Sequence, residues 1–321
     1  MNPFDLIALI FTDYTIRTVM MGALVLGIVS GTLSAFAVLR KQSLLGDTMS
    51  HAALPGVIIA FLITGERAPL PLLVGAMLAG LLGTLFMGVV TSQTRIKHDS
   101  AQGVVLAVFF GFGMALLSWV VRQPGAEYAG LDQFLFGQAA ATVEADVRTM
   151  AVIGGAALLV IALFWKEIKL VSFDPGYAHT LGMRVSLMNI AITSLIGVAV
   201  VVGLQMVGVV LMSAMIVAPG AAARQWTNRL GMMVVISAVF GAVAGVSGAW
   251  VSAAGVNVPT GPVIVLSATL IVVFSIFFAP NRGLVWESVR QQRRRAALAN
   301  RRAHAEVPVG SVGSAEGATK S

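Results

Sequence analysis

The stretch Leu45-Gly46-Asp47-Thr48-Met49-Ser50-His51-Ala52-Ala53-Leu54-Pro55-Gly56 carries two ionisable residues into one of nine long apolar segments. His51 is the ionisable residue that lies well inside such a segment, and Asp47 lies four positions before it, at the segment's edge. An ionisable group at membrane depth costs about 2.5–3.5 kcal/mol on insertion scales and usually marks a substrate or ion pathway. Residues four apart share one face of a helix, so the pair predicts two ligands for a divalent transition metal.

The composition around this stretch is that of a membrane protein. The 321 residues are 57% apolar and 11% charged, with a mean hydropathy of +0.89, whereas soluble domains average about 25% charged residues. Cysteine is absent, which excludes disulfide scaffolds, Cys-ligated zinc and iron–sulfur clusters. Residues 1–11 show neither a basic start nor a small-residue cleavage site, so no secretory signal is expected.

Runs of about 20 apolar residues predict an all-α transmembrane bundle of about eight to nine spans. The expected spans are 16–39, 48–64, 69–91, 101–121, 146–164, 186–203, 206–222, 230–254 and 261–279. The second and seventh are short, and we expect Pro55 and Pro219 to break their ends. Short segments interrupted by proline often line a pathway rather than face lipid.

Basic residues are distributed unequally between the two sets of loops. One set holds Arg40, Lys41, Arg95, Lys97, Lys166, Lys169, Arg184, Arg224, Arg229 and an Arg-rich tail at 290–302, and the other holds Arg17, Arg67, Arg122 and Arg148. The positive-inside rule predicts that the first set and the C-terminus are cytoplasmic, so the net charge of +7 indicates topology rather than nucleic-acid binding. We expect a transmembrane domain at 1–285 and a basic, then low-complexity cytoplasmic tail at 286–321 without fixed structure.

Small residues at four-residue spacing occur in three spans, as the pairs Gly27/Gly31, Ala76/Gly80 and Gly241/Gly245. Such pairs let helix backbones approach closely in lipid. They predict a compact bundle, with one of the three pairs a candidate for contact with a partner subunit.

Asp47 supplies a hard oxygen and His51 a borderline nitrogen, a mixture suited to Mn, Fe or Zn rather than Ca or Mg. Two ligands are too few for a tight site, but a symmetric dimer would bring a second pair to its axis and give an N2O2 set. The alternative is structural: Asp47 caps the helix and His51 is a hydrogen-bonded core residue.

No other motif predicts catalysis. His98 and His179 fall in expected cytoplasmic loops and His304 in the tail, none with a partner at ligand spacing inside a span. The sequence lacks a phosphate-binding G-x-x-x-x-G-K-[ST] loop, H-E-x-x-H and G-x-S-x-G, which argues against an enzyme and against bound nucleotide. No permanent cofactor is expected.

The longest expected cytoplasmic loop, Lys166–Arg184, contains a candidate short helix. Asp174-Pro175 is typical of an N-cap followed by proline at the first helical position, and Gly182 of a C-cap. A polar, exposed helix over Asp174–Gly182 could dock a soluble partner or merely stabilise the turn.

Several stretches together resemble one family, the integral permeases of manganese, zinc and iron ABC importers (ABC-3 type). Residues 45–56 are close to the family's G-D-x-x-S-H-A-x-L-P-G. Residues 172–182 are similar to its cytoplasmic coupling segment, and residues 207–219 to its V-G-x-x-L-x-x-A-x-x-x-x-P. Residues 97–103 resemble a fourth loop, with Gln102 where the family more often has an apolar residue.

The resemblance implies a type II ABC importer: a homodimeric permease of the bacterial inner membrane, bound to cytoplasmic ATPase subunits and fed by an extracytoplasmic metal-binding protein. It implies Asp47 and His51 as ligands of a transported Mn, Zn or Fe ion. It also assigns contact with the ATPase to Phe173, Asp174, Pro175, Ala178, Leu181 and Gly182. An iron-chelate permease of the siderophore type and an uncoupled channel remain the alternatives.

Overall fold

The computed structural model describes residues 13–65, 69–122, 137, 142–255, 258–281, 283 and 286. The described chain contains helices and no strand, in agreement with the all-α prediction. In chain order its helices are α2 (Tyr14–Leu39), α3 (Leu45–Thr64), α4 (Pro69–Gln93), α5 (His98–Val121), α7 (Glu144–Leu163), α8 (Trp165–Phe173), α9 (Pro175–Thr180), α10 (Val185–Val207), α11 (Val209–Trp226), α12 (Leu230–Ala254) and α13 (Thr260–Phe278). The predicted tail at 286–321 lies outside the described residues apart from Trp286.

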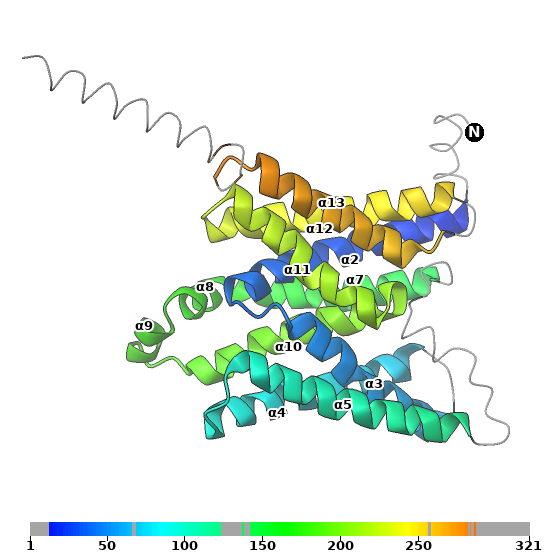
Figure 1. The fold of residues 1–321 in the computed structure, drawn as a ribbon, viewed down its shortest axis with the longest axis horizontal. Coiled ribbons are helices and arrows are strands. Elements are labelled where there is room, and N and C mark those ends of the chain that lie inside the picture. Colours follow the sequence, from blue (N-terminus) through cyan, green and yellow to red (C-terminus); the bar gives the residue numbers. More distant parts are fainter. Residues whose placement is uncertain are drawn as a thin grey trace, which may run out of the picture.

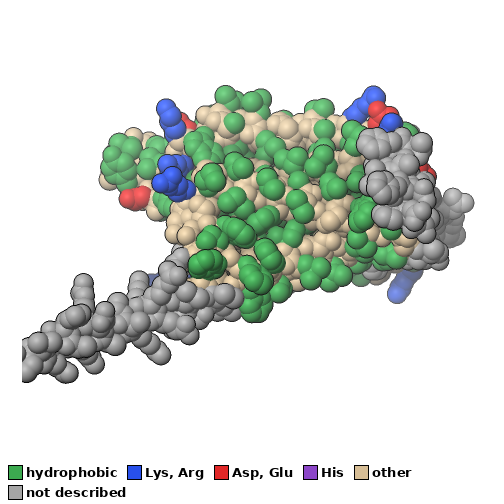
Figure 2. Space-filling model, turned by 90° about the horizontal axis from the view of Figure 1, so that it is seen from above, with side chains coloured by type: hydrophobic (Ala, Val, Ile, Leu, Met, Phe, Trp, Pro, Cys, Tyr) green, Lys and Arg blue, Asp and Glu red, His purple; other side chains and the backbone are tan. Residues whose placement is uncertain are grey.

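Each expected span corresponds to a helix whose ends lie within about four residues of the prediction. Eight described helices are long and apolar enough to cross a membrane. The expected seventh span is α11, an 18-residue helix that is not among those eight. In Figure 2 apolar side chains cover the middle of the molecule and charged side chains gather at its two ends, as expected of a multi-pass membrane protein.

The prediction that Pro55 and Pro219 break their segments is wrong. Both prolines lie inside continuous helices, Pro55 in α3 and Pro219 in α11. Membrane helices tolerate proline where neighbouring groups satisfy the freed backbone. Next to Pro219, the Gly220 N–H donates to the Ser34 hydroxyl of α2 over 2.8 Å, so a side chain of another helix bonds to the backbone at this turn.

The helix α2 runs through the centre of the molecule, against α7, α10, α11 and α12 (Figure 1). A Cβ atom added at Gly27 would overlap the Gly241 carbonyl, and one added at Gly245 would overlap the Ala23 carbonyl. The pairs Gly27/Gly31 and Gly241/Gly245 therefore pack against each other within one chain and are not available to a partner subunit. We call this contact of α2 with α12 the glycine seam.

A second close approach joins α3 to α4, in the lower part of Figure 1. It is made by Gly56 and Gly75, since a Cβ on either glycine would overlap the other's carbonyl group. The predicted pair Ala76/Gly80 lies beside this contact: Ala76 is fully buried, but Gly80 makes no comparably close approach. This contact holds α3 in place on the side away from its ionisable residues.

Candidate functional site

The helix α3 presents Asp47 and His51 together on one face. Asp47 lies in the first turn, and its Oδ1 is 3.4 Å from the Nε2 of His51, one turn further on. The side chains are 36% and 17% exposed, so the pair is reachable without being fully solvated. Asp47 is not a helix cap, because the N-cap is Leu44, which makes no side-chain capping bond.

The face of α3 that carries the pair lies between two neighbouring helices. On one side the His51 ring contacts Phe110 of α5, with ring centroids 4.6 Å apart and planes at 71°. On the other side Gly46 lies against Ser213 and Ile216 of α11. The helices α4 and α10 also pack on α3, and between Leu45 and Ile58 every residue of α3 except Asp47 and His51 is buried.

Several polar atoms near this face are buried and have no hydrogen-bond partner in the described part of the chain. They are Ser50 Oγ, His51 Nδ1 and both amide atoms of Gln102. The side chains of Ser50 and Gln102 are fully buried. An unsatisfied buried polar group costs about 1–3 kcal/mol, so the contact of α3 with α5, here called the polar seam, carries a cost that the glycine seam does not.

Within the described residues no group of three or more His, Cys, Asp or Glu side chains could hold a metal ion. Asp47 and His51 therefore form a pair of candidate ligands without a third such side chain beside them in the described part of the chain. His98 and His179 are exposed, and His304 lies outside the described residues.

The sequence indicated the Asp47–His51 pair but not its surroundings. Phe110 belongs to an apolar run in which nothing distinguishes it from Phe109 or Phe112, so the sequence held no signal for its contact with His51. Gln102 carried a weak signal, as a polar residue at a usually apolar position of the resembling loop. Its complete burial emerges only from the packing of α5 on α3 and α4.

Arg40, assigned from the sequence to a basic cytoplasmic loop, is not a simple solvated charge. It follows the last residue of α2 and donates from Nη2 to the Asn189 Oδ1 of α10 over 2.9 Å. Burial lowers the pKa of its guanidinium to about 10, because desolvation disfavours the charged form. Arg40 thus ties the end of α2 to α10.

The candidate docking helix exists, although it is shorter than expected. The Asp174 side chain accepts a hydrogen bond from the Tyr177 N–H over 2.8 Å and caps α9, with Pro175 in the first turn. At the other end the Gly182 N–H bonds to the His179 carbonyl and the Met183 N–H to the Ala178 carbonyl. These two bonds form a Schellman motif, and Gly182 has the positive φ of 78° that the motif requires.

Two expectations about this region need correction. Residues 166–184 are not a loop with one helix, because α8 (Trp165–Phe173) fills its first half and continues from α7 after a break at Phe164. Nor is the exposed surface purely polar: beside His179 and Thr180, the side chains of Phe173 at the end of α8, Tyr177 of α9 and Leu181 after α9 are exposed, the last three by more than half, while Ala178 is buried. Together α8 and α9 project from one end of the bundle (Figure 1).

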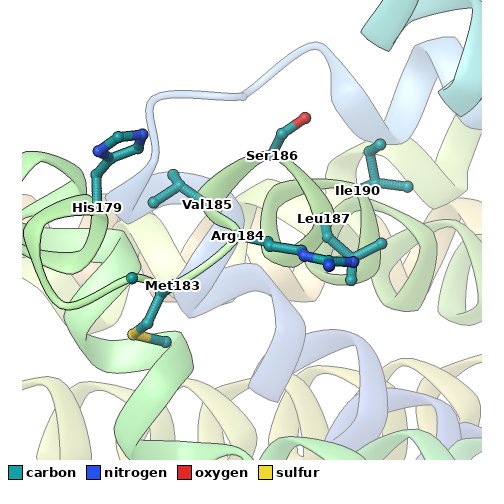
Figure 3. A pocket seen from close by; sticks show the side chains of 8 residues that line it. His179, Met183, Arg184, Val185, Ser186, Leu187 and Ile190 are labelled. Atoms are coloured by element: carbon teal, nitrogen blue, oxygen red, sulfur yellow. The ribbon is translucent and has the colours of Figure 1, made fainter.

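Beside α9, where the chain turns into α10, a hollow of about 590 Å³ opens at the surface. Figure 3 shows His179, Arg184 and Leu187 around it. Exposed apolar side chains next to a hollow can accept a protruding element of another protein.

Comparison with known proteins gives a consistent result along most of the chain. Residues 12–279 match the model of the ABC 3 transport family. The zinc transport system membrane protein TroC of Treponema pallidum is 49% identical over 284 residues, which cover 88% of this chain and 95% of TroC. The manganese transport system membrane protein MntC of Bacillus subtilis is 47% identical over 277 residues, 86% of this chain but only 64% of MntC.

Two solved structures are similar. PsaBC from Streptococcus pneumoniae in complex with Fab matches with a TM-score of 0.76 and 32% identity, over 87% of this chain and 96% of that chain. An inward-facing conformation of a putative metal-chelate type ABC transporter matches with a TM-score of 0.65. Its identity of 11%, over 86% of this chain and 89% of that one, shows a shared fold alone.

Proposed function

Because the chain belongs to the ABC 3 transport family, and is a multi-pass permease subunit rather than an enzyme, we propose that Asp47 and His51 bind a divalent Mn, Zn or Fe ion in transit. ATP hydrolysis takes place on a separate subunit of such transporters. The family also implies an extracytoplasmic metal-binding protein as the donor of the ion, and the bacterial inner membrane as the location. The ion is the transported substrate, not a permanent cofactor.

The observation that carries the proposal is the spacing of the two ligand atoms. For an ion about 2.0–2.1 Å from each atom, the 3.4 Å between Asp47 Oδ1 and His51 Nε2 gives an angle at the ion of about 110°. That angle is near the tetrahedral value. Octahedral coordination requires an angle of about 90°, which the Asp47 and His51 ligand atoms would reach by moving about 0.5 Å closer to each other. The pair can therefore bracket a transition-metal ion with little rearrangement, and the choice among Mn, Zn and Fe is left to the remaining ligands.

We infer that a second copy of the chain completes the site. Two ligands leave at least two positions of a four-coordinate ion open. The Asp47–His51 face lies between α5 and α11, where helices of the same chain leave it partly exposed. A symmetric dimer with this face at its axis would contribute a second Asp47 and His51.

Alanine substitution of either ligand tests the proposal. Asp47→Ala and His51→Ala should each abolish metal uptake while the protein still inserts and folds, because removal of an intramembrane ionisable group does not oppose insertion. Uptake of radioactive Mn, Zn and Fe would be measured in a strain that lacks the natural transporter. The one metal whose uptake restores growth identifies the substrate.

His98→Ala is the matched control, since His98 is exposed at the start of α5. It should transport like the parent. Normal uptake by both Asp47→Ala and His51→Ala would refute the proposal. Uptake of an iron chelate that bare Mn or Zn fails to inhibit would instead favour a chelate permease.

We further propose that α9 and the residues flanking it, with the exposed side chains of Phe173, Tyr177 and Leu181, form the docking element for the ATPase subunit and that this end of the molecule is cytoplasmic. The caps at Asp174 and Gly182 and the burial of Ala178 fix α9 in place. A fixed apolar surface can transmit ATPase closure to the spans through α8 and α10, which adjoin α9 in the chain.

Gly182→Val separates this role from ion binding. A β-branched residue at positive φ costs about 1–3 kcal/mol, and no atom lies near the place of its Cβ, so backbone strain is the cause of any defect. We expect weaker co-purification of the ATPase and lower uptake, with metal binding unchanged. Gly155→Val in α7 is the control, because its Cβ also meets no atom and Gly155 has no positive φ; it should behave like the parent. If Gly182→Val leaves ATPase association and uptake unchanged, the docking surface lies elsewhere.

A further inference from the structure

The imidazole of His51 has an unusual environment for a metal ligand. Its Nε2 faces Asp47, but its Nδ1 is buried and has no hydrogen-bond partner among the described residues. A histidine that binds a metal almost always donates its other N–H to a carboxylate, a carbonyl or water, and this bond fixes the orientation of the ring. The described chain supplies no such bond to His51.

The ring is instead in contact with an aromatic side chain. Phe110 of α5 lies against it in an edge-to-face arrangement, with centroids 4.6 Å apart and planes at 71°. Aromatic pairs prefer this geometry because the positive edge of one ring meets the negative face of the other. The contact restricts rotation of the imidazole, which is what a hydrogen bond to Nδ1 would do.

Phe110 is itself held by its neighbours. It packs on a buried cluster of Leu54, Ile58 and Val120, formed by α3 and α5. The two helices meet closely here because Gly113 has no side chain: a Cβ there would lie 3.0 Å from Leu54 Cδ2 and 3.2 Å from Pro55 Cδ. The backbone of α5 is thereby brought near enough to α3 for Phe110 to reach His51.

We propose that Phe110 is a positioning residue for the transported divalent metal ion, which holds the His51 ring so that Nε2 points toward Asp47. This inference rests on the proposed function, in which Asp47 and His51 bind the ion. It has a consequence for transport. Because α5 packs mainly on α3 and α4, a shift of α5 along α3 would withdraw Phe110, free the His51 ring and weaken the hold on the ion.

The test compares variants with and without an aromatic ring at position 110. Phe110→Leu keeps an apolar side chain but removes the edge-to-face contact, whereas Phe110→Tyr keeps the ring. Phe109→Leu is the matched control, since Phe109 is the adjacent, partly buried phenylalanine of α5 and pairs with Phe86 instead of His51. Phe110→Met serves in place of Phe110→Leu if the latter does not fold, as judged by thermal unfolding.

Two readouts are needed, both on the full permease with its ATPase subunits in lipid nanodiscs or proteoliposomes. Titration with Co²⁺ reports affinity and, through its visible absorption bands, the geometry of the ligands. Uptake of Mn²⁺ or Zn²⁺ gives KM and kcat separately. An edge-to-face pair corresponds to a twofold to tenfold change in affinity, roughly.

Phe110→Leu should raise the Co²⁺ dissociation constant and the uptake KM by about that factor, alter the absorption bands, and change kcat by less than about twofold. Phe110→Tyr should restore parental values and Phe109→Leu should retain them. Parental affinity and spectrum in Phe110→Leu, or an equal defect in Phe109→Leu, would overturn the inference. His51→Ala in the same assays keeps the two proposals apart: if it abolishes binding while Phe110→Leu is normal, only the positioning role fails.

Discussion

The glycine seam between α2 and α12 and the polar seam between α3 and α5 solve the problem of packing helices in lipid in different ways. In the glycine seam, backbones touch at Gly27 and Gly241, and the Ser237 hydroxyl donates to the Gly31 carbonyl. In the polar seam, the buried Nδ1 of His51 and both side-chain amide atoms of Gln102 have no hydrogen-bond partner among the described residues. In the apolar 18-residue stretch of α2, 72% of the residues are buried inside the chain. In the corresponding stretch of α5 the buried share is 17%.

From this difference we infer that the glycine seam is a scaffold, and the polar seam borders the proposed ion site. Backbone contact between glycines leaves no side chain that could rearrange, and small residues of this kind supply van der Waals packing, the main attraction between helices in lipid. Unsatisfied polar groups raise the free energy of the folded state, and residues that lower stability gather where activity requires them. The Asp47–His51 pair lies on α3, one of the two helices of the polar seam, and on neither helix of the glycine seam.

The largest expected effect comes from adding a side-chain atom at the backbone contact of the glycine seam. Gly27→Ala would place a Cβ on the Gly241 carbonyl, so the two helices must separate. Overpacking of this kind costs 1–3 kcal/mol or more, roughly, and should strongly lower the thermal unfolding midpoint in detergent. Gly155→Ala, with no atom near its added Cβ, is the control; equal stability of the two variants would contradict the role of the seam.

A polar-to-apolar change in the other seam should act in the opposite direction. Gln102→Met removes a buried amide whose two polar atoms find no partner among the described residues, and replaces it with an apolar chain of similar length. The expected result is a rise in the free energy of unfolding of about 1–3 kcal/mol, measured by chemical or thermal denaturation. A loss of stability would mean that the amide is satisfied in the folded protein.

The smallest expected effect is the loss of one satisfied hydrogen bond. Ser237→Ala deletes the donor to the Gly31 carbonyl and should lower the free energy of unfolding by about 0.5–1.5 kcal/mol. Ser247→Ala in the same helix removes a hydroxyl that bonds only within α12, to the Ala244 carbonyl. The difference in unfolding midpoint between these two variants measures the interhelical bond, and no difference would show that the seam depends on glycine contact alone.

The sequence by itself determined the spans and the spacing of the two ligands. Apolar runs of about 20 residues must form helices, since the bilayer offers no other partner for backbone groups. The 3.6-residue period then puts Asp47 and His51 on one face, as the 3.4 Å between them shows. The pattern Asp-Pro followed by Gly182 likewise gave the caps of α9, because these depend on local backbone geometry.

Tertiary structure decided which surfaces meet. In a chain whose spans are apolar all round, hydrophobic pattern does not tell an inward face from a lipid-facing one. The sequence could not show that Gly27 meets Gly241, that Ser34 supports the turn after Pro219, or that Phe110 rather than Phe109 lies against His51. Each of these contacts joins residues far apart in the chain, so it depends on how whole helices pack, and local sequence carries no record of it.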